Sequence, residues 1–68
     1  AESIEKSIGA LQNKKNGLLK EQEALIRRRA NADAEEQIHI AELLGANIQN
    51  LVQAEKSLEF VKNLLKVH

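Results

Sequence analysis

The chain has 68 residues, no cysteine, no proline, and ten acidic against ten basic side chains. It therefore lacks a thiol for a disulfide, a thiolate metal site or a cysteine nucleophile, and it has no net charge to attract nucleic acid or anionic lipid. No apolar run approaches the roughly 18 residues of a membrane span, and the first residues do not resemble a secretory leader. We therefore expect a soluble, cytoplasmic protein with no membrane partner.

The composition predicts an all-α fold. Leu, Ala, Glu, Lys, Gln and Ile dominate, and most of these residues lose little side-chain freedom in a helix. Threonine is absent and Phe60 is the only aromatic residue, so the sequence contains few residues that favour strands.

The first expected helix covers about residues 3–30. Ile4, Leu11, Leu18 and Leu25 stand seven apart and form one heptad column. Ser3 offers an acceptor near the start of the helix, and the arginine run 27–29 suits its negative carboxyl end.

A tight turn is expected at about residues 31–33. Asn31 tolerates a left-handed cap after the first helix. Asp33, with Glu36 three residues later, resembles the capping box of a second helix.

The second expected helix covers about residues 34–67. Leu44, Leu51, Leu58 and Leu65 form another heptad column. Further apolar residues flank this column and widen it into a broad stripe: Ile40, Ala54 and Val61 on one side, Ala41 and Ile48 on the other. A stripe this broad favours a helical bundle over a thin two-stranded seam.

These elements predict an antiparallel helical hairpin that forms one domain over residues 1–68. Residues 1–30 carry seven basic and four acidic groups, a net charge of +3, whereas residues 33–68 carry three basic and six acidic groups, a net charge of −3. The two halves are therefore electrostatically complementary. With a turn near 31–32, Leu18 would face Gly45 in a close helix approach, and Asn16 would pair with Asn47 in a polar layer.

Two alternatives remain open at this point. A break at Asn16-Gly17 would give three helices, near 3–15, 18–30 and 34–67. A continuous 68-residue helix would use the charge complementarity between chains. The heptad phase from Ile4 to Leu25 passes through Gly17 without a shift, which favours the unbroken hairpin.

A two-helix hairpin leaves one side of each helix uncovered, so we expect a homodimer that completes a four-helix-type bundle. The end of the second helix is apolar almost all round, which predicts a dimer or partner interface there. Its residues are Phe60, Val61, Leu64, Leu65 and Val67.

Nothing in the sequence predicts catalysis, a cofactor or a metal. Glu36 and His39 have the Glu-x-x-His spacing of di-metal sites, but His39 lies beside the apolar stripe and is expected to be a rim residue. The serines lack a nearby histidine, and no glycine-rich phosphate loop is present.

The leading functional prediction is a non-catalytic protein-protein interaction module, acting as an adaptor, an inhibitor or a small chaperone. The alternative is a small nucleic-acid or phosphate-ligand-binding protein that uses its basic first helix. The candidate contacts for that alternative are Lys14, Lys15, Lys20, Arg27, Arg28 and Arg29.

Overall fold

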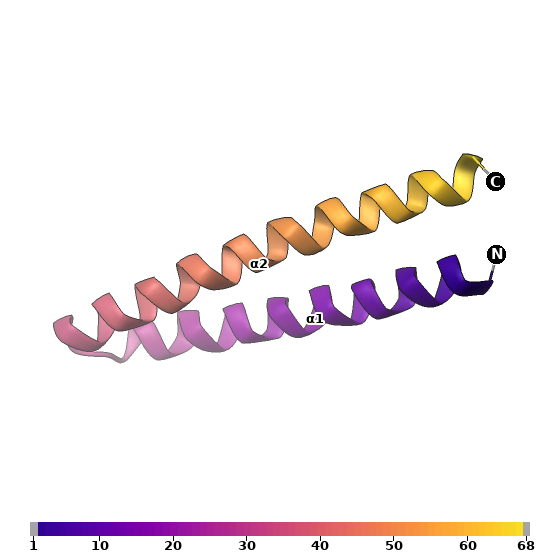
Figure 1. The fold of residues 1–68 in the computed structure, drawn as a ribbon. Coiled ribbons are helices and arrows are strands. Elements are labelled where there is room, and N and C mark those ends of the chain that lie inside the picture. Colours follow the sequence, from indigo (N-terminus) through magenta and orange to yellow (C-terminus); the bar gives the residue numbers. More distant parts are fainter. Residues whose placement is uncertain (1, 68) are drawn as a thin grey trace.

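The computed structural model describes residues 2–67 as two long antiparallel helices (Figure 1). Helix α1 spans Glu2–Ala30 and helix α2 spans Ala34–Val67. They form a rod of 52 × 14 × 12 Å with the start of α1 and the end of α2 at one end, here called the open end, and the connecting turn at the other. The expected hairpin is confirmed. A break at Asn16-Gly17 and a continuous single helix are both wrong, because α1 runs unbroken through residue 17 and ends at Ala30.

The contact between the helices follows two heptad columns on each helix. On α1 the columns include Leu25, which is buried, and Ile4, Leu11 and Leu18, which are half-buried. On α2 the buried residues, Asn47 included, follow one another at steps of seven, four, three and four from Ile40 to Leu58, and Ile40 is 0% exposed. The buried apolar set is Leu25, Ile40, Leu51, Ala54 and Leu58.

The broad stripe expected on α2 is only partly covered. Ile40, Ala54 and Val61, from one side of the leucine column, turn toward α1, whereas Ala41 and Ile48, from the other side, are exposed. One helix covers only a narrow face of another, so a stripe wider than that face keeps an uncovered edge.

Among the residues whose burial the structure describes, Asn47 is the one polar residue buried in the contact, with 3% of its surface exposed. Its Nδ2 donates a hydrogen bond to the Leu18 carbonyl oxygen at 2.9 Å, and its Oδ1 has no partner among the described residues. The expected pairing with Asn16 does not form, because Asn16 is exposed. The Asn47 hydrogen bond places Leu18 and Asn47 at the same level along the rod.

The close approach expected at Gly45 is also wrong. Gly45 is exposed, and outside its own helix backbone no atom lies within 4 Å of the position that a Cβ would take. The space beside Gly45 is open to solvent and not filled by α1.

The turn is held by Asp33, as its position predicts. Its Oδ1 accepts a hydrogen bond from the Glu36 backbone N–H at 2.8 Å, which caps the start of α2. The Glu36 carboxylate lies 3.1 Å from Arg28 Nη2 and so joins the two helices across the turn. Asn31 does not take the expected left-handed conformation, since no non-glycine residue in the described part of the chain has a positive φ.

Gln37 stabilises the end of α1 through hydrogen bonds. The sequence did not predict this contact. The Nε2 of Gln37 donates hydrogen bonds to the carbonyl oxygens of Ala32 at 3.2 Å and Arg29 at 3.5 Å. The backbone N–H of Asn31 bonds the Arg28 carbonyl at 3.2 Å. These contacts satisfy carbonyl groups that a helix end leaves without partners.

Replacing Gly17 with alanine should raise the free energy of unfolding by about 0.5–1 kcal/mol. Gly17 lies inside α1, and no atom outside its own helix backbone stands within 4 Å of a Cβ placed there. The methyl group would therefore lower the entropy of the unfolded chain without a clash. Urea denaturation followed by circular dichroism measures the change. A loss of stability would show that Gly17 supports a turn and that α1 is not continuous.

Candidate interaction surfaces

The five residues predicted at the C-terminal interface do not form one surface. Val61 is half-buried against α1, whereas Phe60 is 64% and Val67 is 81% exposed. Phe60, Leu64 and Val67 recur at helical spacing and share an outer face of α2. Leu65 continues the leucine column that faces α1 and still has 37% of its surface exposed.

The six basic residues predicted to contact a phosphate ligand are not gathered into one patch either. Three of them lie beside carboxylates within the hairpin: Lys15 Nζ is 3.7 Å from Glu55 Oε1, Arg27 Nη2 is 3.6 Å from Glu23 Oε2, and Arg28 bonds Glu36. Lys15 also belongs to a column that faces α2, so its stem packs in the helix contact while its ammonium reaches the edge. Lys14, Lys20 and Arg29 are exposed elsewhere on α1.

The structure reveals an exposed apolar row on α2 that we call the outer seam. Its residues follow one another at steps of three, four, three and four, and all are exposed, Ile38 at 66% and Ile48 at 49%. This is the spacing of a coiled-coil seam, on a face that α1 does not cover. The outer seam consists of Ile38, Ala41, Gly45, Ile48 and Val52.

Helix α1 adds Leu19 and Ile26 to the same flank of the hairpin. Leu19 of α1 and Lys62 of α2 border one shallow groove of about 380 Å³. Lys62 follows Ile48 by two heptads, so these two residues lie in the same column of α2. The flank of α1 that carries Leu19 therefore lies beside the column of α2 that carries Ile48. Ile26, one heptad after Leu19, is 53% exposed on that flank. We call the outer seam together with Leu19 and Ile26 the seam face.

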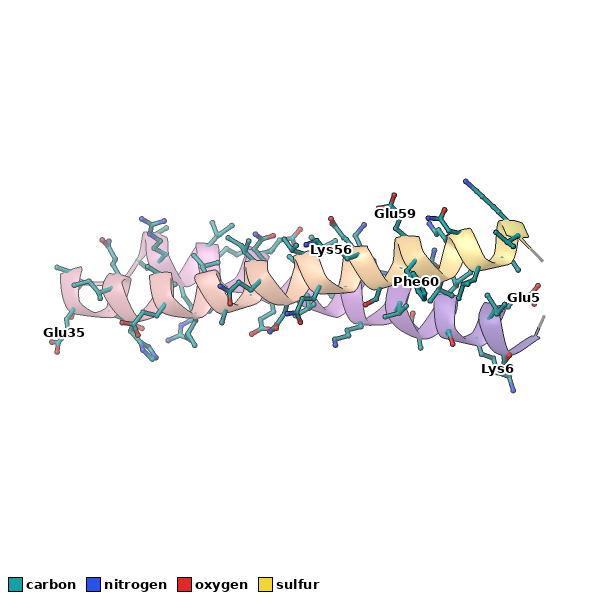
Figure 2. The ribbon with its side chains drawn as sticks, turned by 45° about the horizontal axis from the view of Figure 1, so that its top comes forward. Glu5, Lys6, Glu35, Lys56, Glu59 and Phe60 are labelled. Atoms are coloured by element: carbon teal, nitrogen blue, oxygen red, sulfur yellow. The ribbon has the colours of Figure 1, made fainter. Side chains whose placement is uncertain are left out.

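Toward the open end the same flank becomes charged. A neighbouring groove of about 310 Å³ borders Leu58 and is otherwise lined by charged residues: Lys15, Glu55, Glu59 and Lys62. Figure 2 shows Glu59 pointing away from the hairpin at this end and Glu35 doing so at the turn. The flank is thus apolar over its turn-proximal half and ionic over the other.

The seam face could be found in the sequence only by its spacing. Ala41 and Ile48 each stand one position after the core residues Ile40 and Asn47, so two seams overlap on one helix. A periodic pattern alone does not indicate which of two adjacent seams packs against α1.

No metal centre is found within residues 2–67, where no group of three or more His, Cys, Asp or Glu side chains is placed to bind an ion. His39 is exposed. Neither of the two described helices combines the length and apolar character needed to cross a bilayer.

Comparisons with known protein families, with characterised proteins and with solved structures find no match to this chain.

Proposed function

We propose that this chain is a non-catalytic protein-protein interaction module, acting as an adaptor, an inhibitor or a small chaperone through a self-associating helical hairpin. The observation that carries the proposal is the seam face, where seven apolar or small residues lie exposed together on one flank of the rod. Contiguous apolar surface of this kind marks interaction sites in small proteins.

The spacing of the outer seam favours a helix as the bound element. Its steps of three and four residues repeat the pattern by which α2 already packs on α1. An amphipathic helix with apolar residues at the same spacing would interdigitate with it. Phe60, Leu64 and Val67 provide a second exposed apolar face on α2 for a different contact.

The charge arrangement supports the alternative function less well. Lys15, Arg27 and Arg28 already lie beside carboxylates, and phosphate binding would have to compete with those contacts. A protein that binds through the seam face should keep its partner as salt rises, whereas one that binds phosphate should lose it steeply.

Site-specific photocrosslinking in the cells that make the protein tests the proposal. A photoreactive phenylalanine analogue is placed at Val52 in the outer seam or at Phe60, and the matched control carries it at Asn50, an exposed polar position of α2 away from the seam. We expect discrete protein adducts from Val52 or Phe60 and none from Asn50. Adducts only with nucleic acid, equal adducts from all three positions, or no protein adducts would overturn the proposal.

A further inference from the structure

We propose that the outer seam binds a second copy of this chain, with the two α2 helices antiparallel and a two-fold axis passing beside Gly45. The inference rests on the proposed function and deepens it, because it names the occupant of the seam. The pairing would bring the two seam faces together in a four-helix section, with the two turns pointing in opposite directions and the two open ends extending beyond it.

The seam is nearly self-complementary when it is reversed. From Gly45, seam residues lie seven and four positions before and three and seven positions after it. In an antiparallel pair centred on Gly45, Ile38 therefore meets Val52 of the partner subunit, and Ala41 lies within one residue, about 1.5 Å along the helix, of the partner's Ile48. A two-fold interface requires this reciprocity, in which each contact occurs twice.

The sizes of the paired residues match as well. The small Ala41 stands opposite the large Ile48, and Gly45 stands opposite its own copy at the axis. Since no atom outside its own helix lies within 4 Å of a Cβ at Gly45, the space beside it is available to another chain. Small residues at a helix crossing let two backbones approach closely, and large residues on either side fill the remaining space.

The charges beside the seam favour the antiparallel over the parallel orientation. Along the outer border of the seam run Glu35, Glu42, Gln49 and Lys56, at heptad spacing, and all are exposed. The two-fold axis places Glu35 near the partner's Lys56, and Glu42 near the partner's Gln49. In a parallel pair these two columns, one from each chain, would lie on opposite sides of the seam, so Glu35 and the partner's Lys56 would not meet.

Helix α1 fits the same axis. The hydrogen bond from Asn47 to the Leu18 carbonyl fixes the level of the two helices, so Gly45 lies near the level of Lys20 on α1. The axis therefore passes close to Leu19 and brings it toward the partner's Leu19, while Ile26 lies about six residues, or roughly 9 Å, from the axis. Both are exposed, and Leu19 extends the apolar contact at the centre of the seam face.

The size of the face is that of a weak dimer. With the axis beside Gly45, residues 34–56 of the two α2 helices lie side by side, over about 35 Å at 1.5 Å per residue. Across the 14 Å width of the rod this overlap offers on the order of 500 Å² per protomer, about 1,000 Å² in total, which is at the lower end for a specific interface. The charged open half extends past the partner's turn and stays in water.

Single-cysteine variants test the register, because the chain has no cysteine of its own. Under mild oxidation Gly45→Cys should form a disulfide-linked dimer in high yield, since the two copies of residue 45 meet at the axis. Ile38→Cys should not, since its two copies stand 14 residues apart along the helix pair, or about 21 Å. Gly17→Cys, on α1, is a second negative control. Equal crosslinking of Gly45→Cys and Ile38→Cys would indicate a parallel pair and overturn the inference, as would no crosslinking at Gly45→Cys.

A charge substitution then tests the surface without unfolding the hairpin. Gly45→Arg and Gly17→Arg both replace an exposed helical glycine with a better helix former, so both chains should remain helical. Gly45→Arg should raise the dimer dissociation constant at least about tenfold, while Gly17→Arg should leave it unchanged. Analytical ultracentrifugation measures both. Equal effects of the two variants would overturn the inference.

The failure of this inference and of the proposed function are distinguishable. If the wild-type chain is a monomer and Val52 still gives discrete adducts with another protein, the inferred dimer is wrong and the proposed interaction module is supported. A dimer with the predicted disulfide whose adducts join only copies of this chain confirms the seam contact and overturns the proposed adaptor, inhibitor or chaperone.

Discussion

Replacing Ile40 with alanine is expected to lower the free energy of unfolding by about 2–5 kcal/mol. Ile40 is the one large side chain in the described residues with no exposed surface, and it packs near the turn, where α2 first meets α1. Removing three carbon atoms there leaves a cavity that two helices close only partly. Because the stability of a small two-helix protein is low, we expect much of the helix signal in circular dichroism to be lost at 37 °C.

Phe60→Ala is the matched control for this experiment. Phe60 is larger than Ile40, but 64% of its surface is exposed, so its removal should change the unfolding free energy by no more than about 0.5 kcal/mol. Urea titrations of the two variants at the same protein concentration compare them directly. Equal losses would contradict the placement of the core on the face of α2 that carries Ile40.

Replacing Asn47 with leucine is expected to raise the free energy of unfolding by about 1–2 kcal/mol. Asn47 is buried, and its Oδ1 has no hydrogen-bond partner among the described residues, so it carries a desolvation cost that leucine removes. The Leu18 carbonyl loses the hydrogen bond from Asn47 Nδ2 but keeps its place in the α1 backbone. A leucine there would also complete the apolar column of the core.

Asn47→Leu should also allow the two helices to pair in shifted registers, because the buried polar residue disfavours those pairings in the wild-type chain. Asn50→Leu is the control, since Asn50 is exposed on α2 and its replacement should leave the melting temperature nearly unchanged. Thermal unfolding reports stability, and the dispersion of backbone amide signals in NMR reports uniqueness. A lower melting temperature for Asn47→Leu would show that its Oδ1 is satisfied in solution.

The hairpin itself was predictable from local signals that agree with one another. Heptad columns ran through both helices without a shift, the charges of the two halves were opposite, and Asp33 stood where a second helix had to begin. Each signal depends on residues close in sequence or on the helical period, and these determine where helices start, end and face.

The outward-facing contacts were not predictable in the same way. Apolar residues lie on several sides of α2, and the period does not show which of two overlapping seams α1 takes. The structure assigns Ile40 and Ala54 to the hairpin and leaves Ala41 and Ile48 outside. The interface predicted near the C-terminus rested on the high density of apolar residues there, yet one of them, Val61, is half-buried against α1.

Sedimentation equilibrium of the unmodified chain at tens of micromolar is the most direct test of the central claim, that the seam face is covered by another helix pair. We predict a helical species of twice the chain mass of 7.6 kDa, whose association persists as salt is raised. A fully helical monomer of 7.6 kDa at that concentration would contradict it, because the seam face would then be stable in water without a second copy.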